Sequence, residues 1–191
     1  MKSFHGRIGS AVAFLVVAAF AGLPAKAQNL SATVPVGTLP VNIGVNPLTN
    51  KVYVANQNSA NVTVIDGTTN ATTTVAVGTN PNAIAINQVT NQIYVGNLGS
   101  NSVTVIDGAT NATTNIPLAI APYPIVVNPV TNKVYIGSSN GNNVMVIDGA
   151  TNATTAVAVG IIPSNVAVNP TANKIYVASG GGDDVLSLIH I

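Results

Sequence analysis

Only five side chains in this 191-residue chain are acidic, and all five are aspartates, so carboxylate chemistry could use only these groups. Three of them recur in one motif: "VIDGTTNATT" begins at Val64, and "VIDGATNATT" begins at Val105 and again at Val146. Two carboxylates that converge on one point could act as a general acid–base pair or bind a metal ion. Asp183 and Asp184 are the remaining pair and the candidate ligands for Ca²⁺, although two neighbouring acids without further ligands support that site only weakly.

The three recurring aspartates, Asp66, Asp107 and Asp148, are interpreted as structural groups. One carboxylate per repeat lies far from the next around a ring of repeats, so the three are not expected to converge. If each hairpin is centred on its loop, Lys51 faces Asp66 and Lys133 faces Asp148 on the neighbouring strand. Such a cross-strand pair contributes about 0.2–1 kcal/mol and helps to fix the register.

The segment after each aspartate predicts a tight turn. In the second repeat the residue that faces Asp107 is Gln92, which could still donate a hydrogen bond. The carboxylate could also accept backbone N–H bonds from the turn. Gly67 would supply any positive φ there, and Asn70 tolerates a left-handed conformation. The corresponding residues of the later repeats are Gly108, Asn111, Gly149 and Asn152.

Residues 1–27 have the form of a secretory signal peptide. Lys2 and Arg7 form a positively charged segment before an apolar stretch, residues 11–23. The sequence "AKA" before Gln28 then offers a cleavage site. The stretch is shorter than a spanning helix needs, and an uncleaved anchor is the alternative. We therefore expect a mature chain that is secreted, periplasmic or at the cell surface, with no membrane span after cleavage.

The residues after the signal peptide exclude several classes of function. They contain three lysines against five aspartates, and they lack Glu, Arg and Cys. Three lysines cannot neutralise the several phosphates that a nucleic acid presents, so we expect no nucleic-acid partner. A chain without cysteine is not a disulfide scaffold, and a hydrophobic core must hold it together.

A 41-residue repeat organises the rest of the chain. Four tyrosines, four prolines and four asparagines keep this spacing: Tyr53, Tyr94, Tyr135 and Tyr176; Pro40, Pro81, Pro122 and Pro163; Asn46, Asn87, Asn128 and Asn169. Each unit contains four apolar segments between turn signals, which in the second unit are "NAIAIN", "IYVGN", "SVTVID" and "TTNIPLAI". Four strands in a unit of this length are typical of a propeller blade. The sequence therefore predicts an all-β propeller of four-stranded antiparallel blades.

The motif "NPLTNKVYVAN" followed by "VTVIDG" resembles the YVTN-type β-propeller repeat, with "IYVGN", "VYIGS" and "IYVAS" as variants. The resemblance covers residues 31–185. It departs in the second unit, where Gln88 replaces the proline and Gln92 replaces the lysine. The resemblance implies an extracytoplasmic or cell-surface propeller, commonly larger than this chain. It implies no single activity, because propellers include lactonases, dehydrogenase subunits and plain binding modules.

The repeat predicts the organisation of the chain. Residues 1–27 are the signal peptide, 28–39 an outer strand without its blade, 40–80, 81–121 and 122–162 three blades, and 163–191 an incomplete blade. The outer strand is recognised because "SATVPVGTLP" matches "TTTVAVGTNP" one unit later. An outer strand in front and an unfinished blade behind would let the two termini share a blade, which would give a ring of four blades.

The last residues favour a different interpretation. Where the repeat predicts "VTVIDGT", the chain has "VLSLIHI", and "LSLIHI" matches the translation of a transposase-adapter end. We therefore expect the genuine sequence to end near Val185 or Leu186, with a non-native tail from about residue 186, and the chain to be a truncated part of a larger propeller. A natural four-bladed ring with a degenerate last strand is the alternative.

Candidate contact residues lie in the loops that vary between units. The turns after the first and third strands are nearly identical in every unit, whereas the other loops differ, as in "NQNSAN", "NLGSNS", "SSNGNN" and "SGGGDD". Residues that vary are free to make particular contacts, so we expect the interaction face there. The candidates are Tyr123, Asn58, Asn82, Asn97, Asn140 and Asn142. Tyr123 is the only tyrosine outside the repeat position, and a loop tyrosine that covers the core is the alternative.

Three classes of function remain. The first is an exported binding or scaffold module for a protein, peptide or glycan of the cell envelope. The second is a fragment of a larger propeller enzyme, such as a lactonase-like hydrolase or a dehydrogenase subunit, and the third is a purely structural surface-layer or adhesion repeat. The residues favour the first and third, because no nucleophile–base pair, His cluster or phosphate loop can be assembled from them. We expect a non-enzymatic module without catalytic residues, cofactor or metal, unless the full-length gene carries further blades.

Overall fold

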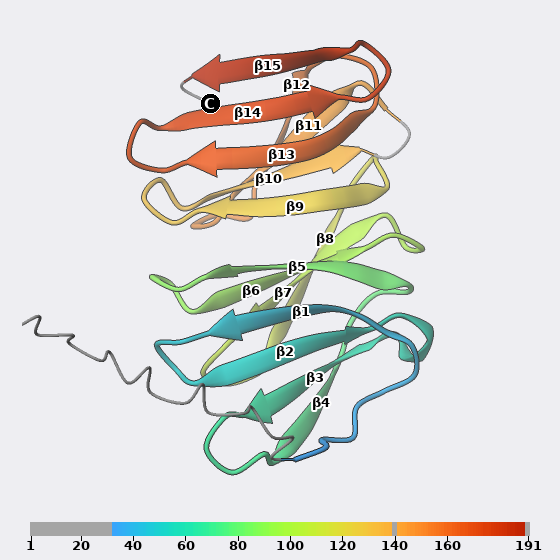
Figure 1. The fold of residues 1–191 in the computed structure, drawn as a ribbon, viewed down its shortest axis with the longest axis vertical. Helices are drawn as coiled ribbons and strands as arrows, with labels where there is room; N and C mark the ends of the chain where they lie inside the picture. The colour runs from blue at the N-terminus through green and yellow to red at the C-terminus, as the bar shows by residue number, and fades with distance from the viewer. Residues whose placement is uncertain (1–31, 139–140, 190–191) are drawn as a thin grey trace, which may run out of the picture. The chain divides into compact units, whose positions relative to one another are not determined.

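The structure, a computed structural model, describes residues 32–138 and 141–189. The chain divides into two units, Met1–Thr33 and Val34–Ile191, and the described strands all belong to the second unit. In this unit the described residues form fifteen strands in four antiparallel sheets (Figure 1). The predicted signal peptide lies outside the described residues.

Each sheet contains one repeat, and its strands lie side by side in chain order. The first contains β1 (Pro40–Asn46), β2 (Lys51–Asn56), β3 (Asn61–Asp66) and β4 (Thr72–Ala76), with a 3₁₀ turn, η1 (Gln57–Ser59), between β2 and β3. The second contains β5 (Pro81–Asn87), β6 (Gln92–Asn97), β7 (Ser102–Asp107) and β8 (Thr113–Pro117). The third contains β9 (Pro122–Asn128), β10 (Lys133–Ser138), β11 (Asn143–Asp148) and β12 (Thr154–Ala158). The fourth contains β13 (Pro163–Asn169), β14 (Lys174–Ser179) and β15 (Asp184–Ile189).

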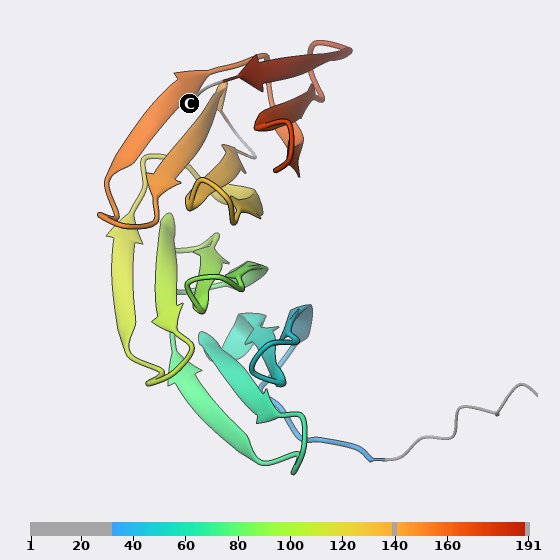
Figure 2. The same ribbon diagram turned by 90° about the vertical axis from the view of Figure 1, so that its left-hand side faces the viewer.

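The prediction of an all-β propeller built from four-stranded antiparallel blades is confirmed. Within the second unit, the sheets follow one another along an arc, with the first strands of the sheets on its inner side (Figure 2). These inner strands contact each other in succession, β1 with β5, β5 with β9, and β9 with β13. The predicted outer strand in residues 28–39 differs: its described residues, 32–39, lie in no sheet.

The predicted register of the central hairpin is confirmed, because Lys51 pairs with Asp66 and Lys133 pairs with Asp148 across the strands. The side chains use this register differently. Lys133 Nζ lies 3.8 Å from Asp148 Oδ2, which is the ion pair that the sequence predicts. Lys51 Nζ instead donates a 2.6 Å hydrogen bond to the carbonyl of Gly108 in the second sheet, so this lysine joins two blades.

The glycine after each aspartate is explained by close approach, and the predicted positive φ is wrong. No described glycine has a positive φ. A Cβ on Gly67 would lie 2.8 Å from the carbonyl oxygen of Asn50, and Gly67 N donates to the same oxygen at 2.8 Å. The left-handed position is taken by Asn70, with φ 60°. The later turns repeat this arrangement with Gly108, Gly149, Asn111 and Asn152.

The hydrophobic core lies between the sheets, because each sheet is apolar on both surfaces. We call the surface that carries the repeated tyrosine the forward face and the opposite surface the backward face. The forward face of each sheet packs on the backward face of the next. Between the first two sheets, the buried contacts join Tyr53, Val62 and Val64 to Ile93 and Ile106. Non-alternating strands such as "VYV" follow from this arrangement, since both surfaces are covered.

A series of hydrogen bonds between asparagines joins successive sheets; we call it the asparagine ladder. Asn46 Nδ2 donates to Asn91 Oδ1 at 2.9 Å, and Asn87 Nδ2 donates to Asn132 Oδ1 at 2.7 Å. The third bond runs from Asn128 Nδ2 to Asn173 Oδ1, at 3.2 Å. All three donor residues are fully buried, so each bond satisfies an amide that water cannot reach.

Candidate functional site

The loops of the sheets gather at two ends with different properties. At the framework end, the turn after the first strand meets the turn after the third, where Asn50 Nδ2 donates to Thr68 Oγ1 at 3.0 Å. At the loop end, the loop after the second strand meets the connection from the preceding sheet, where Leu98 N donates to Asn80 O at 3.0 Å. The repeated motif residues lie at the framework end, and the varying residues lie at the loop end.

The repeated aspartates act within their own turns. Asp107 Oδ1 accepts hydrogen bonds from Ala109 N at 2.9 Å and from Thr110 N and Oγ1 at 2.8 and 3.0 Å. The bond from Thr110 N, followed by the hydroxyl and Ala109 bonds and the more distant Lys51 charge, lowers the pKa of this carboxyl. Asp66 and Asp148 have equivalent partners and lowered pKa values. Gln92 therefore does not supply the hydrogen bond to Asp107 that its position suggests.

Gln92 serves a buried tyrosine instead. The hydroxyl of Tyr94 donates to Gln92 Oε1 at 2.7 Å, and the residue is inaccessible to solvent. Burial, with a smaller contribution from the Asp148 charge, raises the pKa of Tyr94 to about 12. Burial also raises the pKa of Tyr53 and of Tyr135. These phenols stay neutral at physiological pH and pack in the hydrophobic core.

Most of the predicted contact residues lie at the loop end. Tyr123 is the second residue of the inner strand β9 and is 48% exposed, and Asn58 and Asn142 are also exposed. Asn82 occupies the equivalent of the Tyr123 position in β5 and is half-buried. Asn140 lies outside the described residues. The structure thus leaves Tyr123, Asn58 and Asn142 accessible to a ligand.

Asn97 is a correction to the predicted set. It is fully buried at the end of β6, where its Nδ2 donates to Thr104 Oγ1 at 2.9 Å and to Ser102 Oγ at 3.2 Å. The reason is that the buried hydroxyls of β7 require partners, and the asparagine turns inward to them. Asn56 makes the equivalent bond to Thr63, so this position belongs to the framework.

A shallow groove with a polar lining runs from the loop end along β8 toward the framework end. It has a volume of about 360 Å³ and lies between the outer strand of the first sheet and the outer strands of the second. Its lining residues include Gly78, Ser100, Ser102, Thr104, Thr113 and Asn115, with no charged side chain among them. The sequence patterns did not single out this groove, because its residues come from two successive units.

The polar lining of the groove is not repeated between the second and third sheets. The unit-by-unit equivalents of Thr104 and Asn115 are Met145 and Ala156, so a hydroxyl and an amide are replaced by apolar side chains. Ser100 Oγ and Ser102 Oγ lie 3.0 Å apart, and Gly78 N donates to Thr104 Oγ1 at 3.3 Å. We call this the hydroxyl groove.

The acidic residues of the described ranges are not gathered into a cluster. In residues 32–138 and 141–189, no three His, Cys, Asp or Glu side chains are grouped closely enough to bind one. Asp183 and Asp184, the candidate Ca²⁺ ligands, are exposed beside the start of β15. Across the same described ranges, no helix has the length and apolar character needed to cross a membrane.

Comparisons with known proteins identify the fold. No family model matches the chain, and no curated protein matches it. Hydrazine synthase of Kuenenia stuttgartiensis matches 86% of this chain with 23% identity and a TM-score of 0.69. The β-propeller domain of Myceliophteria thermophila Cps50 (Swd1) matches 84% with 8% identity and a TM-score of 0.66. A structure of a nidogen/laminin complex matches 80% with 12% identity and a TM-score of 0.66.

These similarities show the β-propeller fold alone, because every identity is below 25%. The chain covers 49%, 58% and 61% of the hydrazine synthase, Cps50 and nidogen/laminin chains, respectively. It therefore spans about half to three fifths of their lengths. The neighbours include an enzyme, hydrazine synthase, as well as proteins whose names describe no enzymatic activity.

Proposed function

We propose that this chain is an exported, non-enzymatic β-propeller of the YVTN type that binds a partner of the cell envelope through its loop end. The observation that carries the proposal is the hydroxyl groove. Its polar lining is particular to this junction, because the equivalents of Thr104 and Asn115 one unit later are the apolar Met145 and Ala156. Uncharged hydrogen-bonding groups suit a neutral polar ligand, such as a glycan or a peptide backbone.

The framework end supports this assignment by contrast. There the repeated polar side chains bind one another or their own turns, as Asp66 binds Thr69 and Asn46 binds Asn91. Groups engaged in this way have little left to offer a ligand. In the groove the same holds for the buried hydroxyls of Ser102 and Thr104, so the groups available to a ligand are the exposed side chains of Ser100, Thr113 and Asn115. At the loop end, exposed Tyr123 adds an amphipathic surface of the kind that recurs in binding sites.

The proposal is non-enzymatic because the described residues bring no base close to a nucleophile. The three repeated carboxylates are held in separate turns, and the described tyrosines at the repeat positions of the first three sheets are buried. Hydrazine synthase is among the similar structures, so one alternative is that this chain is part of a larger propeller enzyme. A purely structural envelope repeat is the other alternative.

A binding screen separates these functions. The mature chain should bind members of an array of neutral oligosaccharides, or peptides in a parallel pull-down from envelope fractions, and Asn115→Ala should weaken that binding at least about fivefold. Thr154→Ala is the matched control, because Thr154 is the equivalent of Thr113 one unit later and lies outside the groove. Binding that is lost equally in both variants, or absent from both screens, would contradict the proposal.

Export has its own test. Expressed with its first 27 residues in a bacterial host, the chain should reach the periplasm or the medium with a new N-terminus at or near Gln28. The mass of the intact secreted protein reports the cleavage site. Retention of the uncleaved chain in the cytoplasm would overturn the assignment to the cell envelope.

A further inference from the structure

The outer strand of the first sheet has an edge with free backbone groups. β4 pairs with β3 on one side only, and Val77 N donates to Ala60 O on that side at 3.2 Å. The backbone groups of an antiparallel strand alternate between its two sides, so Val75 and Thr73 also face β3. The intervening residues direct their N–H and C=O groups away from the sheet: Thr72, Thr74 and Ala76.

This edge lacks the features that protect other edges. Natural sheets block an exposed edge with charged side chains, prolines or bulges. β4, "TTTVA", contains no charged residue and no proline, and its register with β3 is regular. In β8 the equivalent of Ala76 is Pro117. Leu118 N donates to Asn101 O, so the position of Pro117 faces outward and its missing N–H interrupts that edge.

The place beside β4 lies over β8. Val75 of β4 belongs to the same buried cluster as Ile106 of β7. The chain that leaves β4 also lies on β7, because Gly78 N donates to Thr104 Oγ1 at 3.3 Å. Since β4 packs over β7, a further strand beside β4 would pack over β8, the neighbour of β7 in the second sheet.

The hydroxyl groove coincides with this place. One wall comes from the end of β4, with Ala76 and Val77, and the other wall includes Thr113 and Asn115 of β8. Both of these β8 side chains are exposed, and neither has a hydrogen-bond partner among the described residues. The groove thus has the free backbone groups of a strand edge on one side and free polar side chains on the other.

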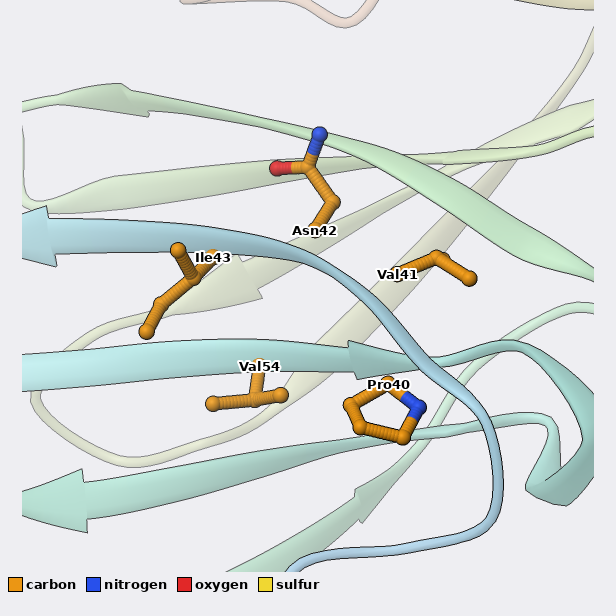
Figure 3. Close-up of a pocket in the computed structure, with 5 residues that line it drawn as sticks. All are labelled: Pro40, Val41, Asn42, Ile43 and Val54. Carbon is orange, nitrogen blue, oxygen red and sulfur yellow. The ribbon is translucent and has the colours of Figure 1, made fainter.

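A larger groove, of about 450 Å³, is different in kind. It lies on the backward face of the first sheet (Figure 3). Its lining residues are Pro40, Val41, Asn42, Ile43 and Val54. The equivalent of Ile43 in the second sheet, Ile84, packs against the first sheet. The larger groove therefore lies on a packing surface between blades, whereas the two walls of the hydroxyl groove belong to sheets that already pack on each other.

We propose that the hydroxyl groove binds an extended peptide, which adds to the edge of β4 as a fifth strand of the first sheet. The inference rests on the proposed binding function of this groove and names the class of its ligand. The peptide backbone pairs with the outward N–H and C=O groups of β4. Strand addition to an open edge is a common mode of peptide recognition, in which backbone bonds supply affinity and side-chain contacts supply specificity.

The added strand would direct every second side chain toward β8. Residues directly opposite each other on neighbouring strands share a face of the sheet. Val75 points to the second sheet, so the peptide residues opposite Val75 and Thr73 point there as well. Thr113 and Asn115 are separated by two residues of an extended strand, about 7 Å, which is also the spacing of these peptide side chains.

The lining determines which peptides fit. No residue that lines the groove is charged, so it offers no partner for an ion pair. None is aromatic either, so the groove offers no flat ring to the face of a sugar. We therefore expect small or polar uncharged side chains at the positions that face β8, and a peptide in preference to a glycan.

Ala76→Pro tests the edge with a residue that the fold already accommodates at this position of β8. It removes one outward N–H from β4 and should weaken peptide binding about fivefold or more. Ala158→Pro in β12 is the matched control. Val159 N donates to Asn142 O, so the backbone of Ala158 also faces outward, but this residue lies outside the groove. Urea midpoints check that both variants fold.

The probes are five-residue peptides of uncharged residues, which match the length of β4, on an array beside neutral oligosaccharides. Fluorescence anisotropy then gives the affinity of the tightest peptide for the mature chain and for each variant. Ala158→Pro should retain the affinity of the unsubstituted chain. Equal affinities for Ala76→Pro and the unsubstituted chain would overturn strand addition.

Two N-methylated forms of the same peptide test the backbone pairing without any substitution in the protein. One form is methylated at its odd-numbered amides and the other at its even-numbered amides. Only alternate N–H groups of an added strand face β4, so one form should bind at least about tenfold more weakly and the other should bind as before. A similar loss in both forms, or in neither, would overturn the proposed pairing.

Failure of this inference differs from failure of the proposed function. Oligosaccharide binding that Asn115→Ala weakens, without peptide binding, would retain the groove as a site and overturn the peptide. Peptide binding that Asn115→Ala weakens and Ala76→Pro leaves unchanged would retain the groove and overturn the added strand. Absence of binding to both kinds of probe would contradict the proposed function itself.

Discussion

Tyr53 and Tyr94 occupy the same buried position in successive blades, but their hydroxyls differ. The hydroxyl of Tyr94 donates to Gln92, whereas that of Tyr53 has no partner in the described residues. Tyr94→Phe should therefore cost about 1 kcal/mol of unfolding free energy, because Gln92 Oε1 loses its short hydrogen bond and keeps only the 3.5 Å bond from Thr90 Oγ1. Tyr53→Phe should be neutral or slightly stabilising. Urea denaturation measures both, and equal losses in the two variants would contradict this explanation.

The repeated aspartate stabilises its own turn, and we expect its contribution to the stability of the fold to be small. In Asp107→Asn the amide oxygen can still accept hydrogen bonds from Ala109 and Thr110, but the charge that strengthens them is gone. We expect a small decrease in melting temperature and no change in binding of any partner found for the loop end. A folded variant that loses binding selectively would show that this carboxylate is functional.

The sequence could predict this turn only in part. The aspartate's acceptor role and the left-handed asparagine follow from residue type alone, as Asp66 and Asn70 illustrate. The prediction that Gly67 is required for a positive φ was wrong, because the contact that requires a glycine there comes from Asn50, which belongs to another turn. Close approach between segments is not encoded in the local pattern.

At the scale of the element, the asparagine ladder links the first strand of one sheet to a turn of the next. Asn132→Gly keeps the left-handed backbone, with φ 53° in the native chain, and removes the acceptor for the buried amide of Asn87. The loss should be about 1–3 kcal/mol, since a buried donor is left unsatisfied.

The control for this variant is Asn70→Gly. Asn70 is also left-handed, with φ 60°, and is exposed. Its substitution should change the unfolding free energy by no more than about 0.5 kcal/mol. If chemical denaturation shows the same loss for both variants, the cost belongs to the backbone and the ladder contributes nothing.

Strand order and hairpin register were accessible from the sequence, because both follow from spacing within one unit. The pairing of Lys51 with Asp66 depends only on the length of the loop between their strands. The ladder was missed, although asparagines recur at both ends of the first turn in every unit. Its bonds join residues 45 positions apart, and the 41-residue period gives no sign of that offset. The hydroxyl groove was missed for the same reason, since two units line it.

For the whole molecule, the shifted pKa values of the three repeated aspartates and of Tyr94 predict that the unfolding free energy is constant over a middle pH range and decreases at both extremes. The fold lowers the pKa of Asp66, Asp107 and Asp148, so their stabilisation is complete above the ordinary carboxylate pKa of about 4. It is lost as the pH falls through the lower folded values. The fold raises the pKa of Tyr94 to about 12, so its stabilisation is complete below the ordinary phenol pKa of about 10 and is lost as the pH rises through about 12.

Urea midpoints measured between pH 2 and pH 12 check both limits, the range being set by the ordinary carboxylate and phenol values of about 4 and 10. The midpoint should be nearly constant from about pH 5 to pH 9 and should decrease on either side. Replacing all three aspartates by asparagine should flatten the acid side and leave the alkaline side unchanged. An acid limit that persists in the triple variant would assign it to other groups.

The ladder also gives the chain a direction, because every donor lies in one unit and its acceptor in the next. A recombination event that removed or duplicated one 41-residue segment would therefore leave a correct donor and a correct acceptor on each side of the new joint. No compensating substitution would be needed. We therefore expect blade number in such genes to change in whole 41-residue steps.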